Sequence, residues 1–126
     1  MKTFIAACIL LILLFACVCL NSSFVVHTID GYHAIIQEQT RATEGVGLYE
    51  QFTTLTELWQ KWKKDVRLLS LTVNHADLMV VEEKFSAAIG AASADAYEDY
   101  MIAREQLLYS LVHLKEMGEV NLGNIF

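Results

Sequence analysis

The chain has 126 residues, 9 of them basic and 15 acidic, and its formal net charge at neutral pH is −6. This acidic balance argues against nucleic acid, or an anionic surface, as the main partner. The sequence contains no proline, and its three cysteines lie within the first twenty residues. The remainder therefore cannot be a disulfide scaffold, and it is long enough for one small domain with a modest core.

The first predicted element is an apolar N-terminal helix. An unbroken apolar run covers Phe4 to Leu20 and, after a mildly polar step, resumes at Phe24. As one helix over residues 4–26 it would reach about 34 Å at ~1.5 Å per residue. That length crosses a hydrocarbon core of roughly 30 Å with some tilt. We therefore predict a membrane anchor over residues 1–23 and a helical domain over residues 24–126.

Two alternatives to a retained anchor stay open. A cleaved signal peptide has a shorter apolar core, of about 7 to 15 residues, and ends at small residues, whereas this chain has the bulky Val18 and Leu20. Leu14-Phe15-Ala16-Cys17 resembles the acylation motif of a lipoprotein, although Phe15 is a poor second residue. The length of the run favours the anchor. Cys17 and Cys19 are then either small apolar filler or sites of reversible acylation.

Basic residues predict the orientation of the anchor. Lys2 and the N-terminal amine flank one side, and the next basic residue on the other side is Arg41. Cytoplasmic flanks of membrane helices carry an excess of basic residues. We expect a single-pass protein of the cell membrane with a cytoplasmic N-terminus and an extracytoplasmic C-terminal domain.

The rest of the chain has a helical pattern. Apolar residues recur every three to four positions from Val26 to Ile36, so the first helix is expected to continue to about Thr43. Gly45-Val46-Gly47 is the expected turn. A second amphipathic stripe, from Tyr49 to Val73, predicts the second helix, with Trp59 and Trp62 within it.

Two further helices are expected after this stripe. Asn74 with Asp77 three residues later predicts a cap that opens the third helix. Ser93 or Asp95 is expected to start the fourth helix and Gly118 to end it. Short connections make neighbouring helices antiparallel. The predicted fold class is all-α: a transmembrane helix that continues into a small antiparallel bundle of about four helices. The expected inner faces are Leu78, Val81, Phe85, Ala88, Ile89 and Ala92 on the third helix, and Tyr97, Tyr100, Leu107, Leu111 and Leu114 on the fourth.

Several features together resemble a known family. They are the N-terminal anchor, the glycine-containing turn before an aromatic-led helix, Trp59, the Asn74-His75 step and the terminal Asn124-Ile125-Phe126. This combination resembles domain-of-unknown-function family 4363, made of short bacterial membrane-anchored helical proteins. The resemblance implies the same architecture over the whole chain and brings no activity, because the family has none assigned. An alanine-rich stretch from Ala87 to Ala96 and a lower charge content depart from the family pattern.

No motif predicts catalysis or a bound cofactor. Gly45-x-Gly47 lacks the third glycine of a dinucleotide-binding turn, and no Gly-x-Ser-x-Gly element is present. The histidines are scattered, without the spacing of a metal site; they are His27, His33, His75 and His113. We predict no catalytic residue, no metal ligand and no cofactor, and we expect a protein that is not an enzyme.

Two groups of residues are candidate interaction surfaces. The basic group surrounds the tryptophans and either forms a solvated outer face, paired with Glu82, Glu83 or Glu98, or binds anionic headgroups or an acidic partner. The apolar C-terminal group either packs between helices or docks on a neighbouring membrane protein. The two groups are Lys61, Lys63, Lys64 and Arg67, and Leu122, Ile125 and Phe126.

By elimination, the sequence favours a non-enzymatic protein-interaction or accessory module at the cell envelope. Its predicted partners are the membrane and a protein of undefined identity. The anchor could also pair with a second copy. It lacks the Gly-x-x-x-Gly motif that would indicate such pairing, so self-association stays open. The alternative is an extracytoplasmic ligand- or pH-sensing domain that uses His33 or His75, although His75 would equally suit a structural role at a helix start.

Overall fold

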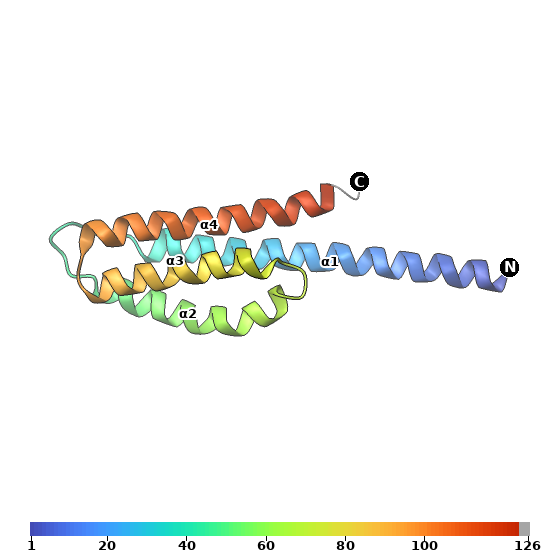
Figure 1. Ribbon diagram of the computed structural model, residues 1–126, viewed down its shortest axis with the longest axis horizontal. Helices are drawn as coiled ribbons and strands as arrows, with labels where there is room; N and C mark the ends of the chain where they lie inside the picture. The colour runs from blue at the N-terminus through green and yellow to red at the C-terminus, as the bar shows by residue number, and fades with distance from the viewer. Residues whose placement is uncertain (124–126) are drawn as a thin grey trace.

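The computed structural model describes residues 1–123, and within that range the chain forms four helices and no strand. They are α1 (Lys2–Gln39), α2 (Tyr49–Leu69), α3 (His75–Ser93) and α4 (Tyr97–Gly123). The helices run up and down in turn, and α1 and α3 each pack against both α2 and α4 (Figure 1). The predicted all-α class and antiparallel bundle are confirmed.

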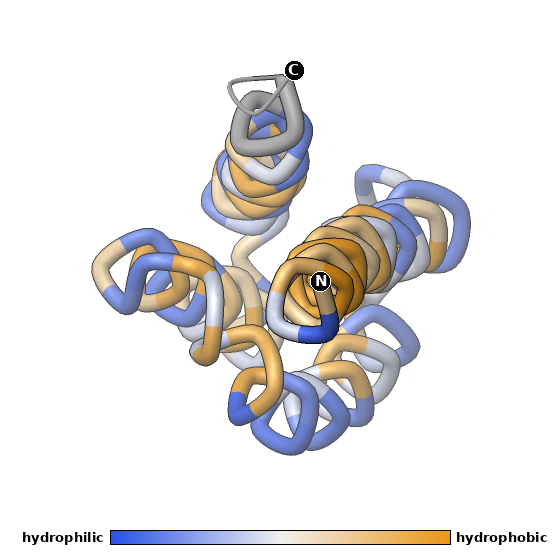
Figure 2. Tube along the Cα trace, turned by 90° about the vertical axis from the view of Figure 1, so that its right-hand side faces the viewer, coloured by the Kyte–Doolittle hydropathy of each residue, from blue (hydrophilic) through white to orange (hydrophobic). Residues whose placement is uncertain are grey.

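The first helix is longer than the bundle. It has 38 residues, and its N-terminal part extends well beyond the other helices (Figure 1). The large apolar side chains from Phe4 to Leu20 are exposed, and behind its first residues this part of the helix is mostly coloured as hydrophobic in Figure 2. By length and composition the helix is able to cross a membrane. We call residues 3–20, which precede the first buried residue of α1, the free apolar segment, a name that refers to the course of the helix and not to the contacts of its side chains. The end of the bundle from which it emerges is the proximal end.

Bundle packing begins slightly earlier than the sequence indicates. Ser22 and Val25 are already buried, and the Ser22 hydroxyl donates a hydrogen bond of 3.1 Å to the carbonyl of Gly118. The last turn of the expected 4–26 span therefore belongs to the bundle. The free apolar segment measures roughly 27 Å at ~1.5 Å per residue, which is close to the thickness of a hydrocarbon core.

The core is built around an aromatic cluster with rings from α1, α2 and α3. Tyr32 of α1 and Trp62 of α2 meet edge to face with ring centroids 5.3 Å apart, and Phe85 of α3 lies 5.9 Å from Trp62. Aromatic pairs of this geometry add about 0.5–1.5 kcal/mol each to the gain from burial. The expected inner faces are largely confirmed, with Tyr97 and Ile89 half-buried at the edge of the core. Tyr49 is the exception: it is 79% exposed, because Leu48 fills the core position at this end of α2.

Three predicted helix ends differ from the structure. α1 ends at Gln39 and not near Thr43, and its cap is the buried Thr40. α4 starts at Tyr97, after Asp95 adopts a left-handed backbone with φ of 54°. Gly118 lies inside α4, facing Val25 and Val26 of α1. These ends depend on contacts between helices, which local sequence signals do not contain.

The predicted start of α3 is confirmed. Asn74 is the N-cap, and its side-chain oxygen accepts a hydrogen bond of 3.0 Å from the backbone N–H of Ala76. Such a cap satisfies one of the free N–H groups of the first turn. His75 is the first helical residue and is exposed, so Asn74 provides the side-chain cap.

Candidate functional site

The predicted basic group lies on the outer face of α2. Its four cations are exposed while Trp62 is fully buried and Trp59 half-buried, so the tryptophans belong to the core as one interpretation expected. The Nζ atom of Lys61 lies 5.3 Å from the centroid of the Tyr32 ring, and that of Lys63 lies 5.3 Å from the Trp59 ring. Exposed cation–π contacts contribute about 0.5–1 kcal/mol each. The two lysines therefore lie against the aromatic edge of the core.

The expected ion pairs of this basic group with Glu82, Glu83 or Glu98 are not formed among the residues that the structure describes. The ion pairs in that range join Arg104 to Glu105 and Lys115 to Asp30. The charges of the basic group are therefore available to an external partner. Of the C-terminal candidates, Ile125 and Phe126 lie outside the described residues, as does the side chain of Leu122.

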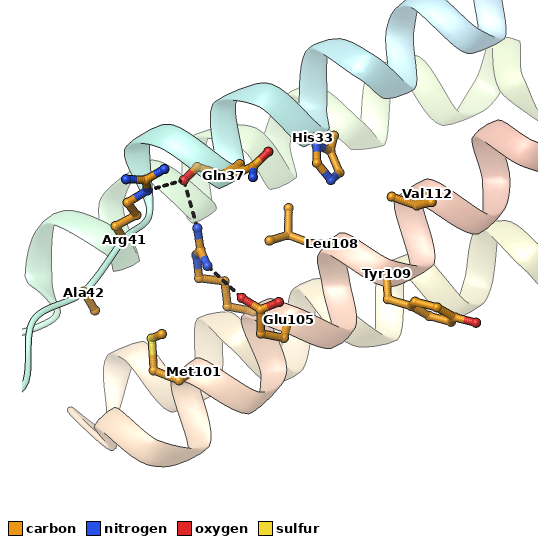
Figure 3. Close-up of a pocket in the computed structure, with 10 residues that line it drawn as sticks. His33, Gln37, Arg41, Ala42, Met101, Glu105, Leu108, Tyr109 and Val112 are labelled. Carbon is orange, nitrogen blue, oxygen red and sulfur yellow. Dashed lines mark hydrogen bonds and ion pairs between the residues drawn. The ribbon is translucent and has the colours of Figure 1, made fainter.

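A groove of about 580 Å³ runs between α1 and α4 (Figure 3). His33 and Gln37 line it from α1, and Leu108, Tyr109 and Val112 from α4. His33 is half-buried and points across the groove toward α4 (Figure 3). The two histidines of the sensing alternative thus differ, because His33 lines a groove whereas His75 is exposed at the start of α3.

The groove ends at a buried polar cluster that the sequence analysis missed. Arg104 of α4 is 5% exposed, and one of its terminal nitrogens donates hydrogen bonds of 3.3 and 2.9 Å to the carbonyls of Ile36 and Gln37. Its Nε atom donates to the hydroxyl of Thr40 at 3.1 Å. The last carbonyls of a helix lack partners within the helix and carry partial negative charge. Arg104 therefore caps the C-terminus of α1 from a different helix.

Tyr100 completes this cluster. Its hydroxyl donates a hydrogen bond to the carbonyl of Thr40, and the Thr40 hydroxyl donates to the carbonyl of Ile36. Burial raises the pKa of Tyr100 above its ordinary value. A sequence signal did exist: Tyr100, Arg104, Leu107 and Leu111 share one helical spacing, so Arg104 occupies a core position. With these hydrogen bonds inside the protein, the cluster is structural.

A second groove lies beside the first. It has a volume of about 720 Å³ and is lined by residues of α3 and α4, among them Val80, Lys84 and His113. Tyr109 lines both grooves and is 75% exposed. The outer face of α4 therefore presents an exposed aromatic ring between two hollows.

A third groove, of about 680 Å³, lies at the proximal end. Leu14, Cys17 and Val18 of the free apolar segment form one wall, and the α2–α3 turn forms another through residues 71–73. Leu114 and Met117 of α4 contribute the remaining apolar surface. This groove brings the turn beside residues of the free apolar segment.

Within residues 1–123, no group of three or more His, Cys, Asp or Glu side chains could hold a metal ion. The comparisons with known proteins give no further identification: no family model, no curated protein and no solved structure matches this chain. The resemblance to family 4363 stays a prediction.

Proposed function

We propose that this protein is a membrane-anchored, non-enzymatic interaction module that displays a helical bundle outside the cell membrane, with its N-terminus in the cytoplasm. The observation that carries the proposal is the continuity of α1. One helix contains both the free apolar segment and the buried Ile29, Tyr32 and Ile36. Such an arrangement suits a protein that acts through the surface it presents.

Side-chain contacts hold the bundle part of α1 to its neighbours. The Tyr32 hydroxyl donates a hydrogen bond of 2.7 Å to the carboxylate of Asp65 on α2, and Lys115 of α4 pairs with Asp30 at 3.0 Å. These contacts join α1 to the helices on either side of it. Because α1 is one continuous helix, these contacts would favour one orientation of the bundle relative to the anchor, as a docking platform requires.

Two faces support docking of a protein partner. The basic group on α2 carries positive charge on a chain whose net charge is −6, so it would select an acidic surface. The exposed Tyr109, flanked by two grooves, is the kind of aromatic residue that often dominates binding energy at interfaces. Both faces point away from the core.

In-cell photo-crosslinking tests the proposal. A photoreactive residue is placed at Lys64 or Tyr109, with a control at the exposed Glu83 of α3. We expect a recurrent protein partner from Lys64 or Tyr109 and none from Glu83. With the probe at position 64, replacing the other three cations with glutamine should abolish capture from that position without changing the melting temperature. Capture of lipid alone from every position would refute the interaction module.

The groove at His33 supports the alternative of a sensing domain. Its polar residues come from two helices, and the charged groups around His33 are Arg41, Arg104 and Glu105, with Asp30 and Lys115 in an adjoining hollow. A pH sensor built on this histidine would change its melting temperature between pH values below and above the ordinary histidine range, and His33→Gln would remove that change. His75→Gln is the control that should keep the response, and a full response in His33→Gln would exclude His33.

A further inference from the structure

We infer that the end of α2 and the α2–α3 turn (residues 70–74) form a second membrane contact, in which Arg67, Leu68 and Leu71 lie in the headgroup layer of an anionic lipid surface beside the anchor. This inference rests on the proposed function in one respect, that α1 spans the membrane. It adds a second site at which the protein binds lipid, and it assigns a role to exposed apolar residues that the bundle does not use.

Position is the first argument. Residues 71–73 line the same groove as Leu14, Cys17 and Val18, so the turn lies beside the free apolar segment. Leu14 lies about 9 Å further along the helix than Leu20, at ~1.5 Å per residue. If the membrane covers the segment up to Leu20, the groove enters its outer layer. Figure 1 shows the turn at the end of the bundle where α1 emerges.

Exposed apolar surface is the second argument. Leu68, in the last turn of α2, is 54% exposed, and Leu71, in the connection that follows, is 77% exposed. Leucine side chains gain free energy when they leave water. Contact with the acyl boundary of a bilayer would remove both from water without any change in the fold.

The backbone of the turn also suits a less polar environment. The N–H groups of residues 70–73 are all bonded within the turn, with donor–acceptor distances from 2.8 to 3.2 Å. The carbonyls of Val66, Leu68 and Leu69 accept these bonds. An unpaired N–H group would oppose transfer out of water. The N–H groups of residues 70–73 therefore add no such free-energy cost when the turn leaves water.

Charge identifies the surface as anionic lipid. Along α2 the acids Glu50 and Glu57 come first, whereas the half nearest the turn holds the four cations and one acid, Asp65, whose carboxylate accepts the hydrogen bond from Tyr32. Arg67 is the closest of them to the turn and is exposed. Basic residues near an anionic membrane bind its headgroups. The predicted role of the basic group is thus divided: Arg67 faces lipid, while Lys61 and Lys63 lie against the aromatic core.

Quenching of tryptophan by brominated acyl chains tests this contact. The full chain is reconstituted into phosphatidylcholine vesicles with and without phosphatidylglycerol, as Leu71→Trp and as the matched control Val46→Trp. Val46 is 63% exposed in the loop at the opposite end of the bundle (Figure 1). We expect strong loss of fluorescence for Leu71→Trp, and for Val46→Trp no more loss than the native tryptophans show.

The outcomes separate the inference from the function on which it rests. A chain that fails to float with the vesicles refutes the anchor itself. A chain that floats but shows no quenching at position 71 overturns the second contact and leaves the anchor intact. Equal quenching at both positions means that the bundle lies flat on the surface, and this also overturns the inference.

A test of headgroup selectivity and a test without an introduced tryptophan complete the design. Adding phosphatidylglycerol should deepen quenching of Leu71→Trp. Arg67→Gln should remove that gain, whereas Glu57→Gln at the other half of α2 should keep it. With the native tryptophans only, Leu68→Gln combined with Leu71→Gln should speed hydrogen exchange of residues 70–73 in vesicles. No change in exchange would overturn the contact.

Discussion

Arg104 of α4 donates a hydrogen bond of 2.9 Å to the backbone carbonyl of Gln37, at the last turn of α1. This contact ends the long helix by using a side chain 67 residues further along the chain. It also joins the first and last helices at the end of the bundle away from the free apolar segment. The helix that would cross the membrane therefore has its end defined by the last helix of the bundle.

Replacing Arg104 tests this cap. Arg104→Met keeps the apolar stem but removes the charged donor that Ile36, Gln37 and Thr40 share. The Ile36 carbonyl keeps its bonds from Thr40, and the Gln37 carbonyl keeps the bond of 3.1 Å from Arg41 Nε, so the cost is that of the lost charged hydrogen bonds, about 1.5–3 kcal/mol. We expect a loss of about 1.5–3 kcal/mol in the free energy of unfolding, measured by chemical denaturation. Arg104→Lys should recover only part of it, because one ammonium cannot reproduce the guanidinium fork. Glu105→Gln is the control: its carboxylate is 67% exposed, and an effect above about 1 kcal/mol would contradict its surface role.

Asp95 combines two functions in the α3–α4 connection. Its backbone is left-handed, and its carboxylate accepts a hydrogen bond of 3.0 Å from the N–H of Leu48. Asp95→Ala should lose about 1–2 kcal/mol of unfolding free energy, since it removes the acceptor and suits this φ poorly. Asp95→Asn should be nearly neutral, because asparagine tolerates φ above zero and retains an oxygen acceptor. Asp95→Gly should fall between them. An Asn variant as unstable as the Ala variant would show that the carboxylate charge matters.

Gly118 offers a stabilising substitution. A Cβ atom there would lie 3.6 Å from side-chain atoms of Val25 and Val26, which is an ordinary van der Waals distance. Gly118→Ala should therefore fit and raise the free energy of unfolding by about 0.5–1 kcal/mol, because glycine disfavours helix interiors. Gly118→Leu should instead lower it by about 1–3 kcal/mol through overpacking. Thermal unfolding of both variants checks the sign, and a destabilised alanine variant would mean that the helices have no room there.

Tyr100 predicts a loss of stability at alkaline pH. Burial raises its pKa in the folded state above the ordinary value of 10.0. The stabilisation from its neutral form is complete below pH 10.0 and is lost as the pH rises above that value, because the unfolded chain then releases the proton more readily. Tyr100→Phe should reduce this alkaline slope of unfolding free energy against pH. Tyr109→Phe, at an exposed position, should leave the slope unchanged, and equal slopes in all three proteins would contradict the assignment.

Much of the fold was predictable because the inner faces are periodic. Leu55, Trp62 and Leu69 recur every seven residues on α2, and all three are fully buried. Asn74 marked the start of α3 through a bond within its own first turn. In such cases the energetic reason for the structure is local or periodic, so the sequence carries it directly.

The parts that were not predictable depend on contacts between distant segments. Thr40 ends α1 together with Arg104 and Tyr100, which lie 60 or more residues away. Gly118 was interpreted as a stop, because a lone sequence does not show that Val25 and Val26 face it. The groove at the proximal end is not predictable for the same reason. A single sequence does not show which residues of α1 lie beside the α2–α3 turn.

Because α1 is one continuous helix, the directions in which its apolar segment presents side chains are fixed relative to those of its bundle part. Consecutive residues of an α-helix are about 100° apart around its axis. Inserting a single residue within the free apolar segment, before Ser22, would leave every contact inside the bundle intact. It would nevertheless turn the outer part of that segment by about 100° relative to the basic group and Tyr109. A partner that binds both the intramembrane helix and the bundle would therefore find its two binding surfaces rotated relative to each other after a one-residue insertion.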